Sequence, residues 1–410
     1  MGVLKDKTIV LGVCGGIAAY KAAELVRLLS AEQARVRVMM SRNAAEFITP
    51  LTLQALSANP VATDTFSLTQ ESEIGHIRLA DTADAIVIAP ASADVIGKAA
   101  AGIADDILTT VLLAARCPVA FAPAMNVHMY EHPAVVENLA RLRARGVTVI
   151  EPAAGELACG YEGKGRLPDP ASIVEEIARM LSPHDLGAER ILVTAGPTQE
   201  MIDPVRFVSN RSTGKMGFAI ARAAWKRGAS VKLIAGPSPL ATPYGAERIN
   251  TVSAADMLSA TARDFPWSTA LVMAAAVADF RPALQAPHKI KKNARGMTLE
   301  LEGIADEMPR LSARKGSRIV IGFAAETQGL EENAADKLRR KRLDFIVAND
   351  VSRSDAGFAV DTNVVTIIGD DGRAVEHPKL TKDEVADVIL DRLLAVRAAR
   401  SGRRTLRAVR

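Results

Sequence analysis

Short apolar runs alternate with longer amphipathic stretches along the first half of the chain. Thr8–Val13 is an apolar run that ends in Cys14-Gly15-Gly16, and the stretch from Ile17 to about Ser30 has helical spacing. The later apolar runs are Val36–Met40, Ala85–Ala89, Val119–Ala122 and Val147–Ile150. Strands and helices that alternate in this way predict an α/β fold with a doubly wound parallel sheet, whose site lies at the carboxyl ends of the strands.

The alternation stops in a polar, turn-rich segment around Met180–Arg190 and then resumes. This change predicts a boundary between a first domain, 1–186, and a Rossmann-like α/β domain, 187–400, followed by a disordered basic tail, 401–410. The elements predicted in the second half are strands Ile191–Thr194, Ser230–Ala235, Ala270–Ala275, Ile319–Phe323 and Phe345–Ala348, helices Met216–Arg227 and Glu331–Arg342, a hairpin from Val364–Gly369 and a closing helix Lys382–Arg400.

Composition and charge narrow the class of protein. Hydrophobic residues make up 49% of the 410 residues and aromatic ones only 4%, which fits parallel strands covered by Ala-rich helices. No apolar run approaches the roughly 18 residues of a membrane span, and we expect no export signal, because Met1–Lys7 already holds three charges. The three cysteines are widely spaced without a Cys-x-x-Cys, which favours a reducing cytoplasm.

The formal charge of +4 does not indicate a nucleic-acid partner. Six arginines lie in residues 397–410, and without them the rest of the chain carries −2. The body of the protein is therefore close to neutral, and the basic end is more typical of a solvated terminus.

Small and polar residues follow the predicted strands of the first half. Gly15-Gly16 lies directly after a strand and opens a helix, so its backbone N–H groups predict an anion cradle, with a tight structural turn as the alternative. Ser41 would add a hydroxyl to the same anion. The turns Pro90–Asp94 and Pro123–Asn126 both follow strands and would wall one pocket at adjacent strand ends.

Cysteine and histidine residues of the first half are candidates for chemistry. Cys159 lies among glycines in an expected mobile flap, and its polar neighbours favour a chemical role over packing. His76 heads a short helical stretch, where a histidine is more often packed or solvated than a base. His128 and His132 have the spacing of a metal pair, but Pro133 follows at once and no third ligand is evident, which argues against a metal there.

Four segments of the first half carry a family resemblance. They are Gly15-Gly16-Ile17-Ala18-Ala19-Tyr20-Lys21, Pro90-Ala91-Ser92-Ala93, Pro123-Ala124-Met125-Asn126 and Ala158-Cys159-Gly160. They resemble the FMN-dependent cysteine decarboxylase family. The resemblance implies FMN contacts at Gly15, Gly16, Ile17, Ser41, Ser92, Ala93 and Met125.

The same resemblance implies the roles of three further residues. His76 would act as a base or orienting group, Asn126 would bind the departing carboxylate and Cys159 would donate the final proton. The flavin would accept a hydride from the carbon that bears sulfur and return it after carbon dioxide has left, so that no net oxidation results.

Two polar clusters stand out in the second half. Ser209–Gly217 places hydroxyls and a lysine at a helix start, which suits phosphate, whereas a capped helix with a solvated lysine is the alternative. His288–Lys292 contains three lysines, and such a run is usually a solvated face. In a cleft facing Asp279, however, the run would neutralise a triphosphate and leave the acid to a cation or a ribose.

These clusters, with Gly322-Phe323-Ala324-Ala325-Glu326-Thr327 and Ala348-Asn349-Asp350, are similar to phosphopantothenate-cysteine ligase. The resemblance implies that Lys289 stabilises charge on the α-phosphate of CTP, that Asn210 holds the acyl-cytidylate, and that Asp279 could bind Mg²⁺. The implied CTP contacts are Met273, Ala274, Ala275, Asp279, Lys289, Ala305, Asp306, Glu307, Met308, Phe323, Lys337 and Lys341.

The order of the halves resembles the bacterial bifunctional phosphopantothenoylcysteine decarboxylase/phosphopantothenate-cysteine ligase family from about Lys7 to about Leu394. It implies ligation of cysteine to 4′-phosphopantothenate and decarboxylation of the product to 4′-phosphopantetheine. It also implies a homo-oligomer, with trimers of the flavin domain that could form dodecamers and with dimers of the ligase domain. The chain departs from the family pattern at Ala305–Met308, where an Asn-Pro-Asp-Ile-like segment is common, and in Gly102-Ile103-Ala104-Asp105-Asp106, where an acid replaces a common asparagine.

Other functional classes remain open from the residues alone. The first half could be a flavin prenyltransferase or a non-catalytic flavoprotein, although His76, Asn126 and Cys159 together argue against both. The second half could be a nicotinamide-dependent reductase, although it lacks the dinucleotide glycine fingerprint and a Tyr-x-x-x-Lys pair.

Overall fold

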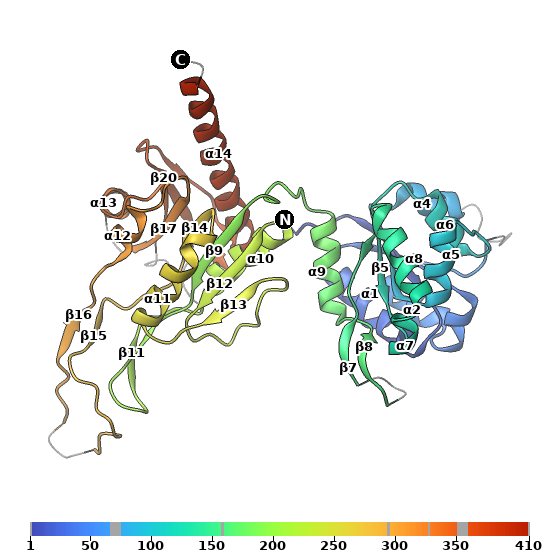
Figure 1. The fold of residues 1–410 in the computed structure, drawn as a ribbon, viewed down its shortest axis with the longest axis horizontal. Coiled ribbons are helices and arrows are strands. Elements are labelled where there is room, and N and C mark those ends of the chain that lie inside the picture. Colours follow the sequence, from blue (N-terminus) through green and yellow to red (C-terminus); the bar gives the residue numbers. More distant parts are fainter. Residues whose placement is uncertain are drawn as a thin grey trace. The chain divides into compact units, whose positions relative to one another are not determined.

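The computed structural model describes residues 2–65, 75–156, 160–292, 296–326, 329–350 and 360–408. The chain divides into two compact units, Met1–Pro183 and His184–Arg410 (Figure 1). The division falls three residues before the predicted boundary at 186/187. In the part that the structure describes, no helix is both long enough and apolar enough to cross a membrane.

The first unit is built on a six-stranded parallel sheet in the order β3-β2-β1-β4-β5-β6. The strands are β1 (Thr8–Val13), β2 (Arg35–Met40), β3 (Val61–Ala62), β4 (Ala85–Ala91), β5 (Val119–Pro123) and β6 (Thr148–Val149). The chain leaves β1 in one direction to β2 and β3 and in the other to β4, so the segments after β1 and β4 face a topological switch point. The predicted doubly wound sheet is confirmed.

Helices cover both faces of this sheet. They are η1 (Ile17–Tyr20), α1 (Lys21–Ala31), η2 (Arg42–Glu46), α2 (Pro50–Ser57), α4 (His76–Thr82), α5 (Ala93–Ala101), α6 (Ile107–Ala114), α7 (Val127–Tyr130), α8 (Pro133–Ala144) and α9 (Pro170–Met180). Successive side chains of β1 point to opposite faces of the sheet and enter two separate cores. Ile9 and Leu11 pack with α1 and α9, whereas Val10 packs on the opposite face with α5 and α6. An antiparallel hairpin, β7 (Ala153–Glu156) and β8 (Glu162–Arg166), was not predicted.

The second unit contains an eight-stranded sheet in the order β13-β12-β9-β14-β17-β18-β20-β21. The strands are β9 (Arg190–Ala195), β12 (Ser230–Ala235), β13 (Glu247–Asn250), β14 (Ala270–Met273), β17 (Ile319–Glu326), β18 (Phe345–Asp350), β20 (Val365–Gly369) and β21 (Ala374–Glu376). The first six are parallel in Rossmann order, and β20 and β21 add the predicted antiparallel hairpin.

The helices of the second unit are α10 (Lys215–Lys226), α11 (Ala254–Asp264), η3 (Phe265–Trp267), α12 (Met308–Ser312), α13 (Leu330–Arg340) and α14 (Lys382–Ala408). α10 and α14 pack side by side, and both contribute to the main core of the unit. Residues 401–408, which were expected to belong to a disordered tail, continue helix α14 to Ala408.

Two pairs of short strands that the sequence did not predict form an arm on the second unit (Figure 1). The pairs are β10 (Gln199–Met201) with β11 (Phe207–Ser209), and β15 (Phe280–Pro282) with β16 (Leu301–Gly303). Ala286 N–H donates to Ile202 O at 2.9 Å, and Ile290 N–H donates to the buried Asp203 carboxylate at 3.2 Å. The segment around Lys289 is therefore attached to the β10–β11 turn. A further pair, β19 (Thr362–Asn363) with β22 (Leu380–Thr381), precedes α14.

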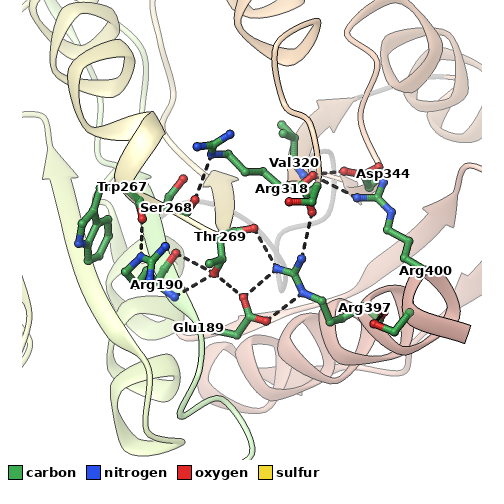
Figure 2. A network of polar contacts seen from close by, with 12 residues as sticks. Glu189, Arg190, Trp267, Ser268, Thr269, Arg318, Val320, Asp344, Arg397 and Arg400 are labelled. Carbon is green, nitrogen blue, oxygen red and sulfur yellow. Dashed lines mark hydrogen bonds and ion pairs between the residues drawn. The ribbon is translucent and has the colours of Figure 1, made fainter. Parts of the chain in front are cut away.

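A polar network joins α14 to the amino ends of the parallel strands of the second unit (Figure 2). Arg397 contacts the Glu189 carboxylate with two nitrogens, at 2.9 and 2.8 Å, and donates to Thr269 O at 2.9 Å. Arg400 binds the Asp344 carboxylate, whose other oxygen accepts from Val320 N–H at 2.7 Å. Because both acids have several donors, this end of the sheet is closed by satisfied charges.

Candidate functional site

The glycine turn after β1 has one glycine that packing requires and one that faces open space. A Cβ atom at Gly15 would lie 2.6 Å from Asn43 Cβ and 2.8 Å from Asn43 O, so the turn closes on η2 only without a side chain. A Cβ atom at Gly16 would meet no atom of a described residue within 4 Å. The turn is therefore both a tight structural turn and a bare backbone surface that a ligand could approach.

The predicted FMN contacts lie around this turn on neighbouring strands. Cys14 N–H donates to Pro90 O at 3.2 Å, which joins the end of β1 to the end of β4. Ser92 is the N-cap residue of α5, and its hydroxyl accepts a hydrogen bond from Val95 N–H at 3.4 Å. Ser41 N–H donates to Val13 O at 3.0 Å, and the Ser41 hydroxyl does not cap η2. The remaining predicted contacts are Ile17, which is exposed, Ala93, the first residue of α5, and Met125, which packs against the core of that face.

Cys14 lies directly beneath the turn and is not a candidate for acid–base chemistry. Its side chain is fully buried, and burial raises the pKa of the thiol to about 12. A thiol with this pKa stays protonated at neutral pH and is a poor nucleophile. Cys14 therefore belongs to the core.

Asn126 and the β7–β8 hairpin form one assembly in the first unit. Asn126 Oδ1 accepts from His128 N–H at 2.9 Å and caps α7. Met125 N–H donates to Gly165 O at 3.0 Å, and a Cβ atom at Gly163 would lie 2.7 Å from Val127 Cγ2. These contacts attach β8 to the turn that carries Asn126.

Cys159 lies outside the described residues, in the connection between β7 and β8. At the β8 side of this connection, Tyr161 packs edge-on against His128 with ring centroids 5.0 Å apart. His132 caps α8, with its Nδ1 accepting from Ala134 N–H at 3.2 Å. His76 is the first residue of α4, and α4 packs chiefly on α6. Asn126 instead caps α7, so the two residues are carried by different elements.

The second unit contains a cavity of about 1130 Å³ at the carboxyl ends of β9, β14, β17 and β18. The sequence-predicted residues that line it are Asn210, Met273, Ala274, Ala275, Asp279, Ala305, Asp306, Glu307, Met308, Phe323, Lys337 and Lys341. Every predicted CTP contact except Lys289 is therefore brought to one site.

Lys289 lies elsewhere, on the arm between β15 and β16. Its side chain is exposed, and it is not part of the cavity lining. The residues next to it are held by Asp203 and by Arg206, whose guanidinium donates to Ile290 O at 3.0 Å. The structure thus does not bring Lys289 together with the other predicted CTP contacts.

Backbone hydrogen bonds position the segment that follows β14. Ala274 N–H donates to Thr194 O at 3.1 Å, and Ala278 N–H donates to Thr198 Oγ1 at 3.0 Å. Asn210 Nδ2 donates to Val277 O at 2.9 Å. These bonds place the Asn210 amide beside the stretch that leads to Asp279, with the end of β9 underneath.

The Ala305–Met308 segment makes a charged contact where it departs from the family pattern. Asp306 pairs with Lys341 at 3.0 Å, and its other oxygen accepts from Met308 N–H at 3.2 Å. Lys341 is thereby held at the cavity wall with its side chain only 16% exposed. An acid in this position orients a cation toward the cavity, while the backbone of the segment remains part of the lining.

Asn363 and Lys382 are among the cavity residues that the sequence did not predict. Lys382 is buried at the start of α14, and burial, followed by the charge of Lys215, lowers its pKa. Asn363 is buried, and its Oδ1 has no hydrogen-bond partner among the described residues. Neither residue lies in a motif, so only the fold brings them to the cavity.

Comparisons with known proteins cover both units. The flavoprotein family model matches residues 2–182, and the model for the DNA/pantothenate metabolism flavoprotein C-terminal domain matches residues 186–396. A solved C-terminal domain of a coenzyme A biosynthesis bifunctional protein CoaBC is 42% identical, with a TM-score of 0.44, and covers 52% of this chain and 96% of that one.

Full-length relatives align with nearly the whole chain. The coenzyme A biosynthesis bifunctional protein CoaBC of Bacillus subtilis (strain 168) is 50% identical over 398 residues, which is 96% of this chain and 98% of the relative. The protein of the same name from Escherichia coli (strain K12) is 45% identical over 396 residues, with 95% and 97% covered. The chain therefore belongs to the family of coenzyme A biosynthesis bifunctional proteins.

Proposed function

We propose that the chain catalyses two consecutive steps of coenzyme A biosynthesis. The second unit joins cysteine to 4′-phosphopantothenate at the expense of CTP, and the first unit decarboxylates phosphopantothenoylcysteine to 4′-phosphopantetheine. The observation that carries the proposal is the cavity of the second unit, which collects the predicted nucleotide residues from separate segments at the carboxyl ends of the strands. Membership of the bifunctional family supports the pairing of the two activities.

FMN is the cofactor proposed for the first unit, and the glycine turn fits it. The open space beside Gly16 gives a phosphate access to backbone N–H groups, and Ser41 supplies a hydroxyl at the end of the neighbouring strand. When bound, FMN would supply reversible hydride acceptance at the substrate. Ser92, the N-cap residue of α5, and the half-buried Met125 would cover the ring and keep water from it.

A side chain at Gly16 should test this cradle. Gly16 has an extended backbone with φ 163°, so valine is tolerated there without strain, but its side chain would fill the cradle. We expect Gly16→Val to fold and to lose the yellow colour of bound flavin. Gly303→Val is a matched control, because a Cβ atom there also meets nothing within 4 Å. Full flavin content in Gly16→Val would contradict the assignment.

Three residues are proposed to handle the substrate in the decarboxylase. Asn126 binds the departing carboxylate, and the cap that its Oδ1 makes on α7 fixes the orientation of the amide. Cys159 donates the final proton, and His76 acts as a base or orienting group. With Cys159→Ser we expect an unsaturated enethiol intermediate to accumulate, as detected by mass spectrometry. An unaltered yield of the saturated product would contradict the role of Cys159.

The ligase must convert a carboxylate into an acyl donor, and CTP would supply the activation by forming an acyl-cytidylate. Asn210, Lys337 and Lys341 line the cavity and offer donors to phosphate and acyl oxygens. Asp279 is exposed at the same cavity and offers the carboxylate oxygen that Mg²⁺ prefers. For Lys289, the support is the sequence resemblance alone.

The test of the whole proposal is product formation by the purified chain. Supplied with 4′-phosphopantothenate, cysteine, CTP and Mg²⁺, it should make 4′-phosphopantetheine. Lys289→Gln should lose the coupling reaction and still decarboxylate preformed phosphopantothenoylcysteine. Equal damage to both activities would contradict separate sites.

We further propose a cytoplasmic homo-oligomer, with trimers of the flavin unit that can build dodecamers and with dimers of the ligase unit. The arm of the second unit supports the dimer, because it exposes the large apolar side chains of Phe207, Phe280 and Leu284. Light scattering on the intact chain should give a mass above that of the monomer. A monomer at micromolar concentration would contradict the assembly.

A further inference from the structure

One corner of the second-unit cavity is built from residues that are not among the predicted CTP contacts. We call it the lysine–asparagine corner, and it consists of Lys215, Asn349, Asn363 and Lys382. The four residues come from the start of α10, the end of β18, β19 and the start of α14. They are distant in the sequence and meet only in the folded unit.

Asp361 shows that these elements are close together. Its carboxylate binds Lys215 Nζ at 2.6 Å, and its backbone oxygen accepts from Lys382 N–H at 2.9 Å. Asn363 follows two residues later, just before β20, which pairs antiparallel with β18 so that Asn349 lies opposite Val365. Lys382 Nζ donates to Val360 O at 2.5 Å.

The corner contains buried polar atoms with no hydrogen-bond partner in the part of the chain that the structure describes. Asn349 is 9% exposed and Asn363 is 3% exposed, and Oδ1 of each side chain accepts no hydrogen bond from a described residue. A buried amide oxygen without a donor costs free energy, so native proteins keep one chiefly where a ligand, ion or water completes the bonding. Both side chains line the cavity, where a ligand can reach them.

The corner also holds two like charges close together. Lys382 is only 7% exposed, and the charge of Lys215 adds to burial in lowering its pKa. Two cations at a cavity wall repel each other, and an anion between them would relieve the repulsion. Asp361 offsets part of the charge at present, but its side chain is 85% exposed, so it can move away when another anion arrives.

We propose that the lysine–asparagine corner binds a phosphate group of a substrate of the ligase reaction. The inference rests on the proposed function, which offers two sources, the pyrophosphate end of CTP and the phosphate of 4′-phosphopantothenate. The lysines would contact phosphate oxygens, and the amide NH₂ groups would donate to them. The amide oxygens would accept from water on a phosphate-bound Mg²⁺, which keeps several waters when it binds.

The test is calorimetric titration of the full-length chain with inorganic pyrophosphate, and separately with 4′-phosphopantothenate and with pantothenate. Lys382→Gln should weaken the binding of one phosphate ligand about tenfold, since it removes a hydrogen bond to a charged group. Asp361→Asn should tighten the same ligand about threefold, because it removes an exposed competing charge. Lys226→Gln, at the other end of α10, is the matched control and should change neither affinity.

The pattern of effects identifies the source of the phosphate. A change confined to pyrophosphate assigns the corner to CTP, and a change confined to 4′-phosphopantothenate, with pantothenate unaffected, assigns it to that substrate. Unchanged affinities for both in Lys382→Gln and Asp361→Asn would overturn the proposal. If Lys382→Gln does not fold, the exposed Asp361→Asn decides alone. Coupling by the wild-type chain is measured in parallel, so that a failure of the proposed function is seen separately.

Discussion

The two ends of the sheet in the second unit treat buried polar groups in opposite ways. At the amino ends of the strands, Glu189 and Asp344 are saturated by Arg397, Arg400 and nearby donors (Figure 2). At the carboxyl ends, two buried amide oxygens have no hydrogen-bond partner within the described ranges, and two lysines lie close together. The same sheet supports both ends, so the difference is not one of fold.

This difference separates residues that hold the fold from residues that hold a ligand. A fully satisfied network gains nothing from a ligand and loses much when one member is removed. Groups left incomplete cost stability in the free protein and repay it on binding. Variants at the amino end should therefore lose stability, whereas variants at the carboxyl end should lose ligand affinity with little change in stability.

The largest effect is expected at the amino end. Asp344→Ala removes a buried acid that binds Arg400, Lys315 and Val320 N–H, which leaves buried donors without a partner. We expect a loss of about 3–5 kcal/mol in the free energy of unfolding. Both tryptophans, Trp225 and Trp267, lie in the second unit, so urea unfolding followed by their fluorescence reports on this unit.

The control for this variant is Asp383→Ala. Asp383 makes an exposed pair with Arg222 at 2.7 Å, and such pairs contribute about 0–1 kcal/mol. Equal destabilisation by both substitutions, or none by Asp344→Ala, would show that the network at the amino end does not stabilise the fold more than an exposed ion pair.

A smaller effect, on ligand affinity rather than on stability, is expected at the carboxyl end. Lys337 lines the cavity, and Lys337→Gln removes a charged donor to the nucleotide. The KM for CTP should rise about tenfold, while the free energy of unfolding should change by less than about 0.5 kcal/mol. Steady-state coupling assays and urea unfolding of the same preparation would check both numbers. A large loss of stability with an unchanged KM would reverse the comparison.

The smallest effect concerns pH, at the end of α10 away from the cavity. Arg227 binds both oxygens of Asp185, at 2.9 and 2.7 Å, and this hydrogen bonding holds the pKa of Asp185 below its ordinary value. The stabilisation is therefore complete above the unfolded-state pKa of about 3.9 and is lost as the pH falls through the folded-state pKa.

The expected result is a pH-dependent difference between the wild-type protein and Asp185→Asn. The wild-type protein should be the more stable at pH 6, and the difference should shrink below about pH 4. Urea unfolding at pH 6, 4 and 3 measures it. A difference that grows on acidification would show that the Asp185–Arg227 pair does not act as described.

Much of the fold could be predicted because buried parallel strands read as continuous apolar runs. Strands β1, β4, β9 and β14 are such runs, and the predicted ends of each strand lie within two residues of the observed ends. The β7–β8 hairpin has no such signal, since β8 reads Glu-Gly-Lys-Gly-Arg, and the strands of the arm are only three residues long. Their pairing depends on tertiary contacts rather than on local pattern.

The candidate site divides along the same line. Residues in motifs, such as Asp279 and Phe323, were predicted through the family resemblance, and the cavity contains them. Asn363 and Lys382 could not be predicted, because an isolated asparagine and lysine carry no local signal and reach the cavity only through β19 and α14. Lys289 was predicted together with the cavity residues, but the structure places it on the arm, apart from the cavity lining.

The measurement that tests the account most directly is pyrophosphate release from CTP by the purified chain without cysteine. We expect release only when 4′-phosphopantothenate is present, and we expect a weaker response in Lys337→Gln at limiting CTP. Release without 4′-phosphopantothenate, or ligation of cysteine in the absence of CTP, would contradict a nucleotide-activating site at the carboxyl end of this sheet.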